Sequence, residues 1–230
     1  MTRDNLGKHL YFAGYPERVI RAQYQQGIQA APELTSIRVH FAEILWDWGY
    51  RDEARKQLAQ ALLIDPYDPA LLTRHGLMLR WQGRFQDSAR QLRTAARLAP
   101  NAPEPHYHLA TTLLSWADDA AARGARGLPG SPILQNRGGS RPSPAEIHQM
   151  RKEALAHLRR SEALEEDSES IHAALGHALV RLGRRGAAAR EFQKAAACAP
   201  PDSPRRHDFQ ELARRLAQDP DELADGDRGE

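Results

Sequence analysis

The chain is poor in cysteine and contains no long hydrophobic run. Cys198 is the only cysteine among the 230 residues, which excludes an intramolecular disulfide and a cysteine metal cluster. No run of about 18 apolar residues occurs, so the sequence predicts no transmembrane helix. The N-terminus lacks the apolar core and the small-residue cleavage site of a secretory signal. We therefore expect a cytoplasmic protein, or a periplasmic one if an N-terminal segment has been removed.

The short motifs that mark catalytic and cofactor sites are also missing. The sequence has no phosphate-binding glycine loop, no dinucleotide-binding glycine pattern and no nucleophile motif around a serine. No two of the ten histidines have the four-residue spacing of a helical zinc site. We predict a non-enzymatic protein without catalytic residues, cofactor or metal, in which Cys198 is a small packing residue.

No large excess of charge of either sign is present. The 32 basic and 30 acidic residues leave a net charge of +2, which gives the chain no general attraction for nucleic acid. Nucleic acid is therefore not the expected partner. Lysine is scarce among the basic residues, and together with abundant alanine this suggests a GC-rich bacterial genome.

What the chain does have is a period of 34 residues, marked by proline and glycine. The positions in phase are Pro32, Pro66 and Pro100, and Gly49 and Gly83. Glycine and proline return in the same phase 100 residues later, at Gly183 and Pro200, which corresponds to two periods and an insertion of 32 residues. A period of this length indicates stacked helix–turn–helix units.

The pattern within each unit predicts two amphipathic helices with a turn between them. In residues 35–68, apolar residues recur on one face up to Gly49, and a second apolar face follows until Pro66 ends the helix. Residues 69–102 repeat this pattern, with Ser88 where the previous unit has Ala54. Residues 169–202 carry its most regular copy.

These units resemble tetratricopeptide repeats. The matching positions in the most regular unit are Leu175, Gly176, Ala188, Phe192, Ala195 and Pro200. The resemblance implies an all-α protein, a right-handed α-solenoid of about five helical hairpins with a C-terminal capping helix. It also implies a protein–protein adapter that holds a peptide or an amphipathic helix of another protein in its concave groove.

The period divides the chain into seven segments. They are a degenerate N-terminal unit (1–34), regular units at 35–68, 69–102 and 169–202, an interrupted unit at 103–168, a capping helix (203–218) and an acidic, disordered tail (219–230). In the first segment we expect helices over residues 5–13 and 17–30. Lys8 and Gly27 replace the small residues expected where the two helices cross.

The interrupted unit contains the 32 additional residues within its hairpin. We expect the first helix to continue to about Arg123, and a capping box at Ser143 and Glu146 to start the second helix early. Residues 124–142 would then form a flexible tip. The tip is either a tolerated surface insertion or a binding arm. The arm's candidate residues are Arg126, Ile133, Leu134, Arg137 and Arg141.

By the same resemblance, the first helix of each unit lines the concave groove. The candidate partner-binding residues are Phe12, Val39, Glu43, Trp46, Leu77, Arg80, Tyr107, Thr111, Leu114, His177 and Val180, with His9, Thr73 and Ala173 beside them. The lysines and asparagines that clamp acidic chaperone tails in this family are absent here. Three further tryptophans near the turns, Trp48, Trp81 and Trp116, are predicted to lie in the core.

The function that these features favour is an adapter that helps to assemble a multiprotein complex. Two alternatives remain open from the sequence. One is a nucleic-acid-associated regulator that uses the arginine-rich insertion, and the other is a non-catalytic module of a larger enzyme. The oligomeric state and the identity of the partner are not encoded in any motif.

Overall fold

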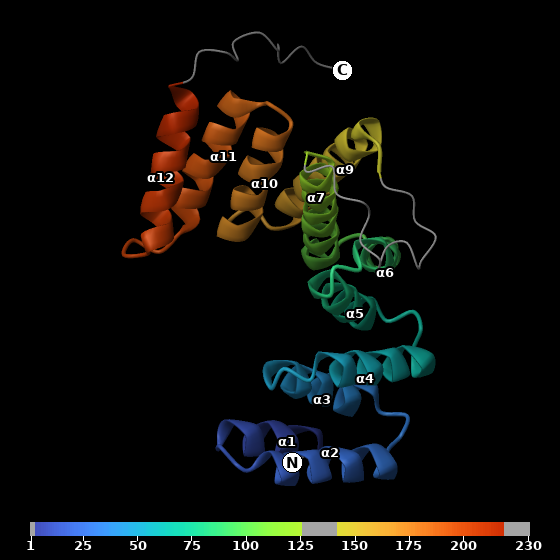
Figure 1. Cartoon of the computed structure of the whole chain (residues 1–230). Coiled ribbons are helices and arrows are strands. Elements are labelled where there is room, and N and C mark those ends of the chain that lie inside the picture. Colours follow the sequence, from blue (N-terminus) through green and yellow to red (C-terminus); the bar gives the residue numbers. More distant parts are fainter. Residues whose placement is uncertain (1–2, 126–141, 219–230) are drawn as a thin grey trace. The chain divides into compact units, whose positions relative to one another are not determined.

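In the computed structural model of the protein, the described residues are 3–125 and 142–218, and they form helices and turns without a strand (Figure 1). The helices are α1 (Arg3–Phe12), α2 (Glu17–Ala30), α3 (Thr35–Asp47), α4 (Arg51–Ile64), α5 (Pro69–Trp81), α6 (Phe85–Leu98), α7 (Pro103–Ala125), α9 (Pro144–Leu164), α10 (Glu169–Arg181), α11 (Arg185–Cys198) and α12 (Pro204–Ala217). This is an α-solenoid of helical hairpins, as the 34-residue period predicts. The tail and nearly all of the predicted tip lie outside the described residues.

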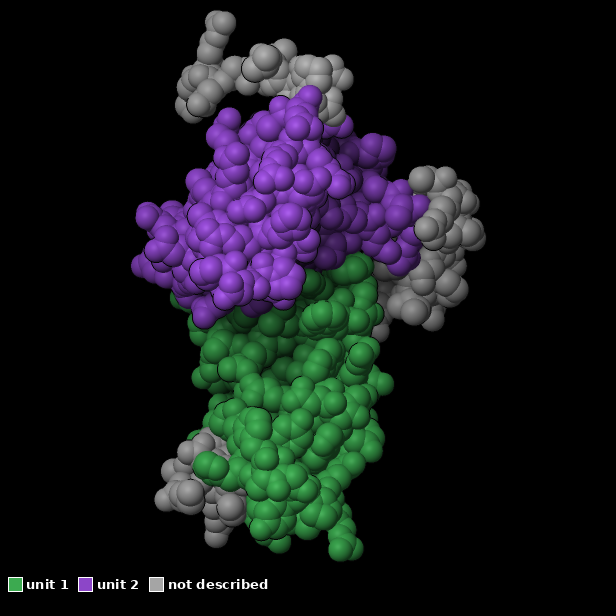
Figure 2. All heavy atoms as spheres, turned by 90° about the vertical axis from the view of Figure 1, so that its left-hand side faces the viewer, with its two compact units in different colours: residues 1–99 green, residues 100–230 purple. Residues whose placement is uncertain are grey.

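The chain divides into two compact units, shown in different colours in Figure 2. Unit 1 comprises residues 1–99 and contains the hairpins α1–α2, α3–α4 and α5–α6. Unit 2 comprises residues 100–230 and contains the hairpins α7–α9 and α10–α11, followed by α12. Each unit is described separately below.

Glycine occupies the turn of four hairpins because the backbone there has positive φ. The φ angles are 73° at Gly14, 88° at Gly49, 71° at Gly83 and 79° at Gly183. A side chain is strained in this conformation, whereas glycine adopts it freely. In the α7–α9 hairpin, Ala117 stands at the corresponding position, and α7 continues without a turn to Ala125.

Small residues allow the two helices of a hairpin to cross closely. A Cβ atom added to Gly76 would lie 2.8 Å from Cγ of Leu92, and one added to Gly176 would lie 2.7 Å from the ring of Phe192. In the first hairpin the residue at the crossing is Gly7, where an added Cβ would lie 2.4 Å from the ring of Tyr24. The prediction that Lys8 takes this position is therefore wrong by one residue.

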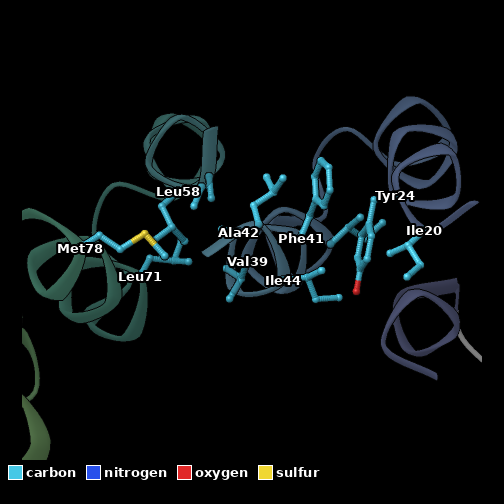
Figure 3. Close-up of a cluster of buried hydrophobic side chains, with 13 residues drawn as sticks. Ile20, Tyr24, Val39, Phe41, Ala42, Ile44, Leu58, Leu71 and Met78 are labelled. Carbon is cyan, nitrogen blue, oxygen red and sulfur yellow. The ribbon is translucent and has the colours of Figure 1, made fainter. Parts of the chain in front are cut away.

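The core of unit 1 runs through successive hairpins (Figure 3). Tyr24 of α2 stacks on Phe41 of α3, with ring centroids 5.0 Å apart. Figure 3 also shows Leu58 of α4 and Leu71 of α5 in the same cluster. The buried Ser88 fits the apolar interior because its hydroxyl donates a hydrogen bond to the Gly76 carbonyl at 2.7 Å.

One hydrophobic cluster of unit 2 contains Phe192, and α12 packs against it. Phe209, Leu212 and Leu216, the apolar stripe predicted for this last helix, pack against the cluster that contains Phe192. At the start of α9 the predicted capping box is confirmed, since Glu146 N donates to Ser143 Oγ and Ser143 N donates to the Glu146 carboxylate. None of the helices in the described ranges is both long and apolar enough to cross a membrane.

Candidate partner-binding surfaces

Unit 1 carries a hollow of about 210 Å³ between α3 and α5. Its lining residues are Val39, Glu43, Trp46, Asp47, Leu58, Arg74, Leu77, Met78 and Trp81. Four of the predicted groove residues lie together here, since the 34-residue period places α3 beside α5 in the same orientation. The wall is largely apolar, with charged groups at its edge.

Trp81 lies in the open part of this hollow, and the prediction that it belongs to the core is wrong. Its side chain is 65% exposed, and the guanidinium of Arg80 lies 5.8 Å from the ring centroid. Trp46 is half-buried, and the guanidinium of Arg51 lies 5.4 Å from the centroid of its ring. Trp48 does pack against the core of unit 1, as predicted. Two indole rings with cations near them therefore border one hollow.

Three of the predicted inward-facing residues are buried. Val39 belongs to the core cluster of unit 1, Leu114 is buried in unit 2, and the Thr73 hydroxyl donates to the Pro69 carbonyl at 2.7 Å. These side chains pack against neighbouring helices because the first helix of a hairpin has neighbours on two sides. Val39 lines the hollow of unit 1 and Leu114 lines a hollow of unit 2, but all three residues leave little surface for a partner.

Phe12 does not occupy the predicted groove position, which is the one equivalent to Trp46. The first helix is shifted by one residue, since Gly14 and Gly49 are 35 residues apart. The residue equivalent to Trp46 is consequently Tyr11, whose hydroxyl donates to Asp47 at 3.4 Å. Phe12 is 81% exposed and touches the edge of Tyr11.

Charges at the edge of the unit 1 hollow are paired. Oε2 of Glu43, a predicted groove residue, lies 3.1 Å from Nζ of Lys8, and the Glu43 carboxylate also forms an ion pair with Arg74. The pKa of Tyr11 is raised by burial and by the nearby Asp47 carboxylate. A partner would meet a neutralised rim around an apolar and aromatic centre.

Unit 2 carries a second hollow, which is wider and more polar. It encloses about 410 Å³ between α7, α10 and α12 and includes Tyr107, Thr111 and His177. Partial burial and the nearby Arg181 lower the pKa of His177, while Asp118 acts in the opposite direction. Val180 is exposed on α10 but does not line this hollow.

An ion pair at the edge of this second hollow joins α7 to α10. The guanidinium of Arg181 binds both oxygens of Asp118, with N–O distances of 2.7 and 2.8 Å from Nε. Asp118 lies on the part of α7 that continues past the usual turn. Arg151 of α9 approaches the same carboxylate at 3.6 Å. The elongated hairpin is therefore tied to the next one.

Several residues of both hollows were not among the predicted ones. Asp47, Trp81 and Arg181 each directly follow a residue at the predicted positions 46, 80 and 180. These three residues stand at the same position of the 34-residue repeat. The prediction did not include them because it took only residues three or four positions apart along each first helix. The candidate arm residues Arg126, Ile133, Leu134, Arg137 and Arg141 lie outside the described residues.

Comparison with known proteins identifies one repeat directly. Residues 35–68 match the family model described as a tetratricopeptide repeat. This segment coincides with the α3–α4 hairpin and its closing Asp65–Pro66 turn. No curated protein matches the sequence.

Solved structures share the fold at low sequence identity. A MamA fragment from Desulfovibrio magneticus is 14% identical, covers 85% of this chain and 92% of its own, and has a TM-score of 0.62. PilF of Pseudomonas aeruginosa is 13% identical, with coverages of 93% and 86% and a TM-score of 0.63. IFIT1 with Gppp-AAAA is 19% identical, with a TM-score of 0.64, and the match covers 83% of this chain but 38% of IFIT1. At such identities the likeness concerns the fold alone.

Proposed function

Because the chain is a tetratricopeptide repeat protein, we propose that it is a non-enzymatic adapter that holds an apolar or amphipathic segment of another protein in the hollow of unit 1. The observation that carries this proposal is the exposure of Trp81 beside Trp46 and Leu77. A large aromatic side chain exposed in a concave apolar wall is costly to keep in water, and such residues typically anchor a partner.

The neutralised rim supports a partner segment without strong charge of one sign. Glu43 is already paired with Lys8 and Arg74, so the hollow offers little attraction to a purely ionic ligand. The guanidiniums of Arg51 and Arg80 near the indole rings supply donors at the border of the apolar surface. An amphipathic helix places an apolar stripe and a polar flank in this arrangement.

The nucleic-acid alternative has less support. Its arginines belong to residues outside the described ranges, and the sequence as a whole has a net charge of +2. Within unit 1 the arginines near the hollow either contact acidic side chains or lie beside aromatic rings. These contacts favour the adapter over a nucleic-acid-binding regulator.

The test is a selection of displayed random peptides on the immobilised full-length chain, followed by titration calorimetry of the selected peptides. We expect Trp81→Ala to weaken their binding by about 1–3 kcal/mol, the range of an interface anchor. Trp46→Ala should have an effect of similar size. Thermal melting of Trp81→Ala should match the original chain because its indole is mostly exposed.

Leu63→Ala provides the control. Leu63 is 84% exposed on α4 and does not line the hollow, so this variant should bind the selected peptides with unchanged affinity. The proposal is contradicted if Trp81→Ala and Leu63→Ala bind equally well. It is also contradicted if the selection yields only peptides that are insensitive to both tryptophan substitutions.

A further inference from the structure

Three side chains with metal-binding atoms converge in unit 2, on the side of α9 and α11. Glu162 comes from α9, His172 from α10 and Glu191 from α11, and one ligand atom of each lies within 4.8 Å of the others. His172 and Glu191 are buried, and Glu162 is nearly so. Because each residue comes from a different helix, no local spacing in the sequence reveals the cluster.

The orientation of His172 directs one ring nitrogen at the carboxylates. Nε2 lies 2.7 Å from the Glu166 carbonyl oxygen, an acceptor, so Nε2 carries a proton and donates it. In the neutral ring, Nδ1 then carries a lone pair. Nδ1 lies 3.0 Å from Oε2 of Glu191 and 3.6 Å from Oε1 of Glu162. Either a proton on Nδ1, shared with Glu191 as a hydrogen bond, or a metal ion can join these acceptor atoms. A carbonyl behind the ring is the usual support of a metal-binding histidine.

Lys194 already supplies a cation to the same two oxygens. Its ammonium lies 3.1 Å from Oε1 of Glu162 and 3.6 Å from Oε2 of Glu191. Half of the Lys194 side chain is exposed, so it can swing into solvent without disturbing the helix. The ammonium therefore occupies the position of a bridging cation and is replaceable.

Arg159 holds the carboxylates from the other side. Its Nη1 lies 2.7 Å from Oε2 of Glu162 and 2.9 Å from Oε1 of Glu191. These are the two oxygens that Lys194 does not contact. Arg159 thus binds one oxygen of each carboxylate, and the other oxygen of each is the one that Lys194 contacts.

We propose that Oε1 of Glu162, Nδ1 of His172 and Oε2 of Glu191 form a binding site for a divalent transition-metal ion, Zn²⁺ above all, which displaces the ammonium of Lys194. In a tetrahedral zinc site with bonds of about 2.0–2.1 Å, ligand atoms lie about 3.3 Å apart. The two separations from Nδ1, 3.0 and 3.6 Å, bracket this value, and all three ligand atoms lie within 4.8 Å of one another. One nitrogen and two oxygens suit zinc better than calcium or magnesium, which prefer oxygen alone.

The site has an entrance and an open coordination position. Two of the ligands, Glu162 and His172, line a hollow whose wall also contains Arg159, Lys194 and Cys198, whereas Glu191 is not part of that wall. With Lys194 displaced, solvent in this hollow supplies the fourth ligand. Three protein ligands and one open position are the usual composition of an accessible zinc site.

The preceding hairpin of unit 2 provides an internal comparison. Allowing for the 34-residue period and the insertion, His106 and His157 occupy the positions of His172 and Glu191. Their Nδ1 atoms are 3.0 Å apart, and Nε2 of His106 faces the Pro100 carbonyl at 3.2 Å. A carbonyl behind the histidine ring is thus present in both hairpins, but in this one a histidine stands where the other has the carboxylate of Glu191. His157→Gln is therefore a matched control for the metal site.

The test is calorimetric titration of the metal-free, full-length chain with ZnCl₂, with Co²⁺ as a spectroscopic probe of tetrahedral coordination. We expect one Zn²⁺ per chain. His172→Gln and Glu191→Gln should each weaken binding at least tenfold, whereas Lys194→Met, which removes the competing ammonium, should strengthen it at least tenfold. His157→Gln should leave the affinity unchanged.

Melting curves of each variant without metal establish that it is folded before titration. The gain in affinity on Lys194→Met does not depend on any loss of stability, so it separates a metal site from a purely structural ion-pair network. The inference is overturned if Lys194→Met binds Zn²⁺ no better than the original chain. It is equally overturned if His157→Gln loses binding to the same extent as His172→Gln.

Discussion

Phe192→Ala is expected to lower the stability of unit 2 by about 3–5 kcal/mol, the usual cost of emptying a phenylalanine site in a packed core. Phe192 is 1% exposed and fills the space that Gly176 leaves at the helix crossing. It also stacks on Phe209 of α12, with centroids 6.2 Å apart. Its removal therefore loosens α10, α11 and α12 together.

Urea unfolding of the full-length chain, followed by circular dichroism, measures this effect. Phe12→Ala is the matched control, because it makes the same substitution at a ring that is 81% exposed. We expect the control to change the unfolding free energy by no more than about 0.5 kcal/mol. Equal losses for the two variants would contradict the assignment of Phe192 to the core.

The second large effect concerns His75, which stands at a core position of unit 1. The equivalent residues of the other hairpins are Phe41, Leu109 and Leu175, all apolar and buried. In the part of the chain that the structure describes, Nδ1 of His75 has no hydrogen-bond partner. Burial, with the nearby Arg55 and Arg84, lowers its pKa from 6.5 to about 4, against a smaller opposing effect of Asp87.

Because this pKa is lower in the folded than in the unfolded chain, the unfolded chain takes up the proton first as the pH falls. The stability of unit 1 should consequently decrease between pH 6.5 and about 4. After a reduction for the partial exposure of the ring, the loss through His75 is about 1–3 kcal/mol. Above pH 6.5 this group contributes no pH dependence.

His75→Leu should remove this part of the acid sensitivity. It should also raise stability at neutral pH by about 1 kcal/mol or more, because the unsatisfied Nδ1 disappears and an apolar side chain fills the site. Urea unfolding of both chains at pH 7.5, 6.0 and 4.5 provides the measurement, since the other histidines contribute equally to both. Parallel pH profiles would show that His75 is not the responsible group.

The features of the fold that depend on residues close together in the sequence could be predicted. The turn glycines, the capping box at Ser143 and the small residue at position 176 each act within a few residues or one hairpin, so the 34-residue period reveals them. The register of α1 was missed because the turn at Tyr15 and Pro16 contains one residue more than the others. A single additional residue moves every side chain of a helix by about 100°.

The surfaces were predicted less completely, since exposure depends on which helices lie on either side. Trp81 and Trp48 both stand near a turn, yet Trp48 packs against the core and Trp81 borders a hollow. The convergence of Glu162, His172 and Glu191 required three helices to be placed in space. No spacing rule for a single helix contains that information.

The replacement of the turn glycine by Ala117 has a mechanical consequence. Because α7 continues as a helix to Ala125, it has turns that the other hairpins lack, and Asp118 in this part of α7 forms an ion pair with Arg181 at the end of α10. The Arg181–Asp118 ion pair thereby holds the additional turns of α7 next to α10, whose His177 and Ala173 line the second hollow. A change in the position of these turns would reach the wall of that hollow through this contact.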